Sequence, residues 1–305
     1  MVKNWGRLLT AMITPYDAEG NVDYDQATTL AKVLLENGSD GLVLWGTTGE
    51  SPVLTLEEKE LLYKHIREAF PEKPLIVATG SNNTKDTVEM TKRAGELGAD
   101  GAMVVVPYYN KPSQQGLYEH FKAAAESTDI PIMIYNIPGR TGITMDVETV
   151  GKLAEIPNVK AIKESAGDVT KVTDFRKVTP DDFVIYSGDD ILTLPMLANG
   201  AYGVVSVASH IAAKPLSEMI ELFVSGNIQE ALHLHEQLTP LFKGLFYDSN
   251  PVPVKLMLDD LGFQTGGVRL PLVKSDEVLA KKILHVLRQY DEDFLNRFSR
   301  SEVKA

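Results

Sequence analysis

The chain has 305 residues, 44% of them apolar, and its 30 Lys and Arg against 42 Asp and Glu give a formal charge of −12. The lack of cysteine excludes a disulfide-stapled scaffold, a cysteine zinc site and a thiol nucleophile, and the negative charge disfavours binding to nucleic acid or an anionic membrane. No apolar run approaches the roughly 18 residues of a membrane span, and the first residues do not resemble a signal peptide, so we expect a cytoplasmic globular protein.

Short apolar runs recur along the chain and predict the strands of a sheet that is covered on both faces. The runs are nearly continuous in apolar residues rather than alternating with polar ones, which is typical of buried parallel strands. They span residues 8–15, 41–46, 75–80, 101–107, 131–136, 159–165, 183–190 and 202–209.

Segments with helical spacing lie between these runs. The clearest cover residues 23–37, 56–70, 84–97 and 113–127. Thr55 and Ser113 stand where N-capping residues are expected, and Gly38 and Gly98 stand where helices commonly end in a left-handed residue. Strand–helix units in such succession predict an α/β fold, a (β/α)8 TIM barrel.

A doubly wound sheet is the alternative architecture. A dinucleotide-binding sheet of that kind usually carries a Gly-x-Gly-x-x-Gly turn after its first strand. Residues 14–20 read TPYDAEG and lack this pattern, which favours the barrel.

The chain continues well beyond the eighth predicted strand. Residues 215–225, 228–246, 252–261 and 275–298 also have helical spacing. We therefore expect a barrel over residues 1–225 that carries the active site, and a C-terminal helical extension over residues 226–305 that packs on the barrel.

Lys163 is the most informative residue at the predicted strand ends, where barrel enzymes build their active sites. The period of a strand places Ala161 and Lys163 on one face and Lys160 and Ile162 on the other. If the Lys163 face points into the barrel, loss of water lowers the pKa of the amine, and a neutral amine can attack a ketone to form a Schiff base. The alternative is a lysine that reaches solvent or pairs with Glu164.

Hydroxyl groups follow two other predicted strands. Tyr135 is a candidate proton carrier for imine formation, with a core tyrosine bonded to a carbonyl as the alternative. The turn Gly46-Thr47-Thr48-Gly49 offers hydroxyls and backbone donors that suit a carboxylate or phosphate, although an ordinary strand-to-helix turn can have the same pattern.

Charged residues at the remaining strand ends give weaker signals. Arg140 presents a planar fork suited to a carboxylate, with a surface arginine as the alternative. Adjacent Asp189 and Asp190 point to opposite sides of a strand, so a helix cap is favoured over a carboxylate pair. The six histidines show no metal-ligand spacing, so we expect no metal site.

Several motifs, in a fixed order, carry a resemblance to a known family. They are GTTGES at 46–51, PYYNKP at 107–112, YNIPGRT at 135–141, KE at 163–164, SGDD at 187–190 and NPVPVK at 250–255. This set resembles the 4-hydroxy-tetrahydrodipicolinate synthase (dihydrodipicolinate synthase) family, in the pyruvate-dependent class I aldolase superfamily that also holds N-acetylneuraminate lyase. The resemblance runs from around Gly6 to past Pro271.

The resemblance implies a lyase reaction that needs no cofactor. Lys163 would form a Schiff base with pyruvate, and Tyr135 would relay protons, linked to Thr47 and to Tyr109 of a neighbouring subunit. The enamine would attack L-aspartate 4-semialdehyde, which opens the diaminopimelate and lysine pathway. A shared Tyr109 implies at least a dimer, and the family is typically a homotetramer built as a dimer of dimers.

The resemblance also implies the substrate contacts. Thr47 and Thr48 would hold the pyruvate carboxylate, and Val205 would offer a backbone carbonyl near the site. Arg140 would bind the carboxylate of aspartate semialdehyde. It favours the synthase over the alternative, a 2-keto-3-deoxy sugar-acid or N-acetylneuraminate aldolase, whose aldehyde partner is a polyol.

A non-catalytic barrel with a binding or regulatory role is the alternative of another class. The presence of Lys163, Tyr135 and Thr47 together disfavours it.

Many members of the family are inhibited by lysine at a site between subunits. The matching positions here are Ser51, Pro52, Leu56, Lys59, Asn82, Asp86 and Tyr108. Inhibitable enzymes of one bacterial group carry histidines at positions 56 and 59 and a glutamate at 86. A cationic Lys59 would repel the ammonium groups of lysine and Leu56 offers no hydrogen bond, so we expect weak or absent inhibition.

Overall fold

The structure is a computed structural model, and it describes residues 2–298. Its sheet is a closed barrel in which the strands follow one another in chain order. Pairing is parallel between β1 and β2 and at each junction from β3 to β8. The strands are β1 (Leu8–Ala11), β2 (Gly41–Leu44), β3 (Leu75–Ala78), β4 (Gly101–Val105), β5 (Ile132–Asn136), β6 (Val159–Glu164), β7 (Val184–Ser187) and β8 (Gly203–Ser206). The predicted (β/α)8 barrel is confirmed.

All the strands except β5 end earlier than the apolar runs that predict them. In β7, the run 183–190 is cut short because Asp189 caps the turn η3 (Asp190–Leu192), where its carboxylate accepts a hydrogen bond from the Ile191 amide at 3.3 Å. The expectation that Asp189 belongs to a cap is therefore confirmed. Apolar residues beyond a strand pack under the following turn, so the sequence pattern overestimates the strand length.

The helices predicted between the strands are confirmed to within a residue or two. Thr55 and Glu58 form a capping box, in which the Thr55 hydroxyl accepts from the Glu58 amide and the Glu58 carboxylate accepts from the Thr55 amide. Ser113 caps the fourth helix, and Gly38 and Gly98 have positive φ at helix ends. The α-helices are α1 (Tyr24–Glu36), α2 (Leu56–Ala69), α3 (Thr84–Glu96), α4 (Gln114–Glu126), α5 (Pro138–Thr141), α6 (Val147–Ala154), α7 (Thr170–Val178), α8 (Thr193–Ala198), α9 (Ser209–Val224), α10 (Ile228–Gly244), α11 (Val252–Asp260) and α12 (Glu277–Leu287).

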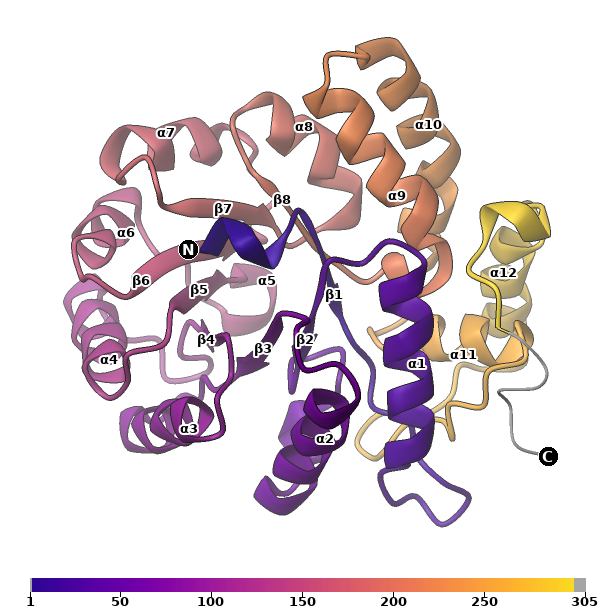
Figure 1. The fold of residues 1–305 in the computed structure, drawn as a ribbon, viewed down its shortest axis with the longest axis horizontal. Helices are drawn as coiled ribbons and strands as arrows, with labels where there is room; N and C mark the ends of the chain where they lie inside the picture. Colours follow the sequence, from indigo (N-terminus) through magenta and orange to yellow (C-terminus); the bar gives the residue numbers. More distant parts are fainter. Residues whose placement is uncertain (1, 299–305) are drawn as a thin grey trace. The chain divides into compact units, whose positions relative to one another are not determined.

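Two compact units divide the chain, and the first comprises residues 2–7 and 74–205. Within it, β4 to β7 are consecutive strands, and α4, α6 and α7 lie beside them (Figure 1). Phe121, Ile162 and Phe175 belong to one buried apolar cluster that joins these strands to these helices. Trp5 packs so closely on β4 that a Cβ atom added to Gly101 would lie 2.3 Å from its ring.

The second unit comprises residues 8–73 and 206–298. Helix α10 packs against α9, and α12 packs against both α10 and α11 (Figure 1). Residues 226–298 thus belong to the same unit as β1 and β2, and the expected domain boundary at residue 225 stays a prediction. Among residues 2–298, no helix is long and apolar enough to cross a membrane.

Helix α9 begins earlier than the expected position 215. It starts at Ser209 and bends at Ala212, where φ is −142° and ψ is 56°. Pro215 has no amide hydrogen for the Ile211 carbonyl one turn back, and the Asn296 amide donates to that carbonyl instead, at 2.7 Å. Pro215 therefore explains the bend, and Asn296 replaces the hydrogen bond that the helix loses there.

The predicted helix over residues 275–298 is wrong in its second half. Only α12 and the short turn η4 (Glu292–Phe294) form there. The chain after η4 docks on α9, since Asn296 donates to the carbonyls of Ser209 and His210 and accepts from the Ala213 amide. Tertiary hydrogen bonds thus replace the last helical turns.

Candidate active site

Lys163 lies in β6, directly beside Tyr135 of β5 and Tyr186 of β7 in the strand register. Its side chain is only 5% exposed. Ile162, on the opposite face, packs in the apolar cluster with the helices. The predicted alternation of the two faces is confirmed, and it places the amine away from the helical layer.

The surroundings of Lys163 make its amine easier to deprotonate than that of a lysine in water. Burial lowers the pKa of Lys163 to about 8, an effect that nearby Arg140 reinforces and that Asp190 and Asp189 oppose. The Nζ atom lies 4.3 Å from the centre of the Tyr135 ring. A Cβ atom on Gly188 would lie 2.8 Å from Cε of Lys163, so only glycine leaves room for the lysine there. The predicted lowering of this pKa is confirmed.

Glu164 is committed to other partners, which removes the alternative of a Lys163–Glu164 pair. One carboxylate oxygen accepts from Nδ2 of Asn136 at 2.9 Å, and the other accepts from the Ala166 amide at 2.6 Å. Burial raises the pKa of Glu164. This carboxylate ties β6 to β5 and leaves the Lys163 amine on the other face.

Tyr135 is buried next to Lys163. Burial raises the pKa of its phenol to about 12, although Arg140 acts in the opposite direction. The phenol is therefore protonated at neutral pH and can donate a proton or a hydrogen bond. A protonated phenol beside a partly neutral amine is an arrangement suited to general acid–base chemistry.

The remaining candidates of the first unit differ in exposure. Arg140 is exposed on α5, directly after β5, and Val205 is buried in β8. Tyr109 is 88% exposed and adopts a left-handed conformation with φ of 74°. A bulky residue held at positive φ with its ring in solvent is unusual. The Asn110 amide donates to the Tyr108 carbonyl at 2.9 Å, so Tyr109 is the central residue of a tight γ-turn.

The turn after β2 carries the two threonines. The Glu50 amide donates to the Thr47 carbonyl at 3.0 Å, and the Ser51 amide donates to the Gly46 carbonyl at 3.2 Å. Thr47 is partly buried and Thr48 is only 4% exposed. The two backbone hydrogen bonds therefore close a compact turn that carries the hydroxyls of Thr47 and Thr48.

The positions matched to the effector site fall in both units. Ser51, Pro52, Leu56 and Lys59 lie in the second unit, on the turn η2 (Ser51–Val53) and the first two turns of α2. Asn82, Asp86 and Tyr108 lie in the first unit. Leu56 is 49% exposed, so its side chain is available to a ligand or partner but offers only carbon atoms.

No cluster of His, Asp or Glu able to hold a metal ion is present within residues 2–298. His210, the most buried histidine, bonds through Nε2 to the Ile13 amide and through Nδ1 to the Val207 carbonyl. Burial lowers its pKa to about 4. It therefore serves as a neutral structural group.

A family model for the dihydrodipicolinate synthetase family matches residues 4–290. The chain belongs to this family. It is 51% identical to the 4-hydroxy-tetrahydrodipicolinate synthase of Moorella thermoacetica, over 93% of this chain and 98% of that one.

Solved structures of the family have the same fold. The dihydrodipicolinate synthase of Bacillus anthracis is 46% identical and superposes with a TM-score of 0.92, over 94% of this chain and 99% of that one. The lysine-bound synthase of Cyanidioschyzon merolae is 45% identical, with a TM-score of 0.91, over 93% of this chain and 97% of that one. The family expected from the ordered motifs is confirmed.

The sequence analysis assigned no role to three polar residues of the extension that contact the β2 turn. Asn250 bonds to Thr48, and Lys255 and Arg269 bond to Glu50. Two sequence signals pointed to them. The family motif at 250–255 contains Asn250 and Lys255, and a lysine in the otherwise apolar stretch 252–258 requires a buried partner. The partner lies 205 positions away in the chain, so only the fold reveals it.

Proposed function

We propose that the chain condenses pyruvate with L-aspartate 4-semialdehyde through a Schiff base on Lys163, the reaction of a 4-hydroxy-tetrahydrodipicolinate synthase. The observation that carries this proposal is the Lys163 amine, which is buried in β6, has a pKa lowered to about 8 and lies 4.3 Å from the Tyr135 ring. Family membership supports the same reaction.

The chemistry begins with attack of the neutral Lys163 amine on the ketone carbon of pyruvate. The carbinolamine loses water to give an iminium, and loss of a methyl proton gives the enamine. Tyr135 carries protons in these steps, linked to Thr47 and to Tyr109 of a second subunit. The enamine carbon then attacks the aldehyde carbon. The amino group of the bound aldehyde displaces Lys163 by transimination, which closes the ring and frees the enzyme.

The two carboxylates need separate partners. Thr47 and Thr48 hold the carboxylate of pyruvate, and the Val205 carbonyl lies near the reacting atoms. The Arg140 guanidinium binds the carboxylate of the aldehyde, for which its planar fork is suited.

The exposed, left-handed Tyr109 supports a shared site in a homo-oligomer. A strained, solvent-exposed aromatic side chain is explained if it enters the site of a neighbouring copy. A shared Tyr109 requires at least a dimer, and we propose the dimer of dimers that is typical of the family. We also propose that the enzyme acts in the cytoplasm, at the start of diaminopimelate and lysine biosynthesis.

Borohydride trapping tests the proposal directly. Reduction in the presence of pyruvate is expected to add the mass of a reduced pyruvate adduct to the peptide that contains Lys163, because borohydride converts the iminium into a secondary amine that water cannot hydrolyse. Lys163→Arg should prevent labelling, since its guanidinium remains protonated. Labelling of another lysine, or none with the wild-type chain, would exclude this mechanism.

A further inference from the structure

The turn after β2 is held by side chains of the C-terminal extension. Nδ2 of Asn250 donates to Oγ1 of Thr48 at 2.8 Å, and both side chains are buried, Asn250 being 7% exposed. We infer that Asn250 is a positioning residue, which aims the Thr48 hydroxyl at the carboxylate of pyruvate. The inference rests on the proposed function, in which Thr48 holds that carboxylate.

The direction of the hydrogen bond sets what Thr48 can do. A hydroxyl has one hydrogen to donate and two lone pairs. Because Thr48 accepts from Asn250, its own hydrogen is left for an acceptor, and a carboxylate is acceptor only. Asn250 thus selects an anionic ligand without touching it.

The other end of the Asn250 amide supports this assignment. Within residues 2–298, nothing donates a hydrogen bond to its buried Oδ1 atom. A buried acceptor without a partner lowers the stability of the folded state. An apolar side chain of similar size would fill this position without leaving an unpaired oxygen. The presence of asparagine therefore indicates that its Nδ2 donor, which bonds to Thr48, is needed.

A second anchor fixes the turn on the far side of Gly49. Glu50 adopts a left-handed conformation with φ of 58° and is buried. Its carboxylate accepts from Nζ of Lys255 at 2.6 Å and from the Arg269 amide at 2.9 Å. Lys255 also donates to the Gly267 carbonyl at 2.6 Å. The buried charge is therefore paired and hydrogen-bonded on both oxygens.

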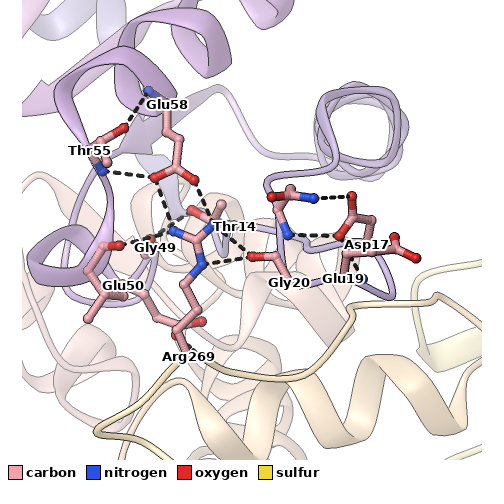
Figure 2. A network of polar contacts seen from close by, with 11 residues as sticks. Thr14, Asp17, Glu19, Gly20, Gly49, Glu50, Thr55, Glu58 and Arg269 are labelled. Carbon is pink, nitrogen blue, oxygen red and sulfur yellow. Dashed lines mark hydrogen bonds and ion pairs between the residues drawn. The ribbon is translucent and has the colours of Figure 1, made fainter.

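Arg269 ties this anchor to the surrounding elements (Figure 2). Its guanidinium forms a bidentate pair with the Glu58 carboxylate, at 2.6 and 3.0 Å, and also donates to the carbonyls of Gly20 and Val53. Glu58 is at the same time part of the α2 capping box. The extension thus clamps both ends of the short segment from Thr48 to Glu50.

A clamped turn matters because a binding group must be held in the productive direction before the ligand arrives. Without Asn250, the Thr48 hydroxyl can rotate to other acceptors. Asn250→Ala is therefore expected to raise the pyruvate concentration for half-maximal borohydride trapping about tenfold, in line with one lost charge-assisted hydrogen bond. The maximal extent of trapping should be nearly unchanged.

A double-mutant cycle with Thr48→Val separates positioning from general damage. If Asn250 acts through the Thr48 hydroxyl, Asn250→Ala should have less than about a twofold effect once that hydroxyl is gone. Additive effects in the two backgrounds would overturn the inference. Asn227→Ala is the matched control, because Asn227 is an exposed asparagine of the same extension that caps no helix through its side chain.

Asn250→Asp provides a second variant of nearly the same shape, should the alanine variant not fold. An aspartate accepts from Thr48 and turns its hydroxyl away from the ligand, so half-saturation should rise by at least as much as in Asn250→Ala. A wild-type value in Asn250→Asp would show that Thr48 donates to position 250 and would overturn the inference. If the wild-type chain traps no pyruvate, the proposed function fails instead, so the two failures are distinguishable.

Discussion

At the scale of single residues, burial of one amine sets the chemistry. Burial lowers the pKa of Lys163 from 10.5 to about 8. At pH 7 the neutral fraction of the amine is then about one in ten, against about one in three thousand for a free lysine. The folded state therefore binds this proton less tightly than the unfolded chain does, so Lys163 destabilises the fold below pH 8. This penalty disappears as the pH rises from about 8 to 10.5.

We expect the pH dependence of Schiff-base formation to report this pKa. At low pyruvate concentration the rate should rise about tenfold per pH unit below pH 8 and level off above it, because only the neutral amine attacks. The measurement is the initial rate of Schiff-base formation between pH 6 and 10, in samples withdrawn at intervals and reduced with excess borohydride at one fixed alkaline pH. In Arg140→Ala the inflection should move to higher pH, since Arg140 helps to lower the pKa of Lys163. A wild-type inflection near 10.5 would contradict the buried-amine mechanism.

Arg140→Ala should separate the two substrates. We expect kcat/KM for aspartate semialdehyde to fall about a hundredfold, as for a lost pair of hydrogen bonds to a charged group, while pyruvate trapping at a pH above the inflection stays within about threefold. Arg140→Lys is the matched control, because it keeps the charge and loses the planar fork. Equal losses for both substrates would show that Arg140 acts through its charge on the whole site and not by binding the semialdehyde.

Cleavage of a 2-keto-3-deoxy sugar acid without turnover of the semialdehyde would favour the aldolase alternative.

At the scale of elements, the start of α2 is fixed from two sides. The capping box of Thr55 and Glu58 holds its first turn, and the Arg269 guanidinium holds the same Glu58 carboxylate. Leu56 and Lys59 are therefore presented by a rigid helix end. A ligand that binds at this face therefore meets the side chains of Leu56 and Lys59 in fixed positions on the helix.

We expect lysine to inhibit the enzyme weakly or not at all. Lys59 carries the same charge as the ammonium groups of lysine, and Leu56 offers no hydrogen-bonding atom. The measurement is the rate of condensation with and without added lysine. Lys59→Gln removes the charge and should increase any sensitivity that exists, with Lys64→Gln on the same helix as the control. Inhibition of the wild-type chain by micromolar lysine would contradict this prediction.

At the scale of the whole molecule, the extension helps to hold the turn after β2, which carries Thr47 and Thr48. Asn250, Lys255 and Arg269 all contact the turn after β2, and residues 226–298 belong to one compact unit with β1 and β2. Thr14, just after β1, also donates to the Gly49 carbonyl at 2.7 Å. The turn is thus built by three segments that are far apart in the chain.

The sequence by itself determined the barrel, the family and the face of β6 on which Lys163 lies, because strand period, caps and ordered motifs are local properties that neighbouring residues fix. It overestimated the helix at 275–298, since Asn296 finds its partners on α9. The tertiary structure alone decided how far the pKa of Lys163 is lowered and which residues are the partners of Thr48 and Glu50. Burial and buried hydrogen bonds depend on residues up to 219 positions away, and no local pattern encodes which of them will meet.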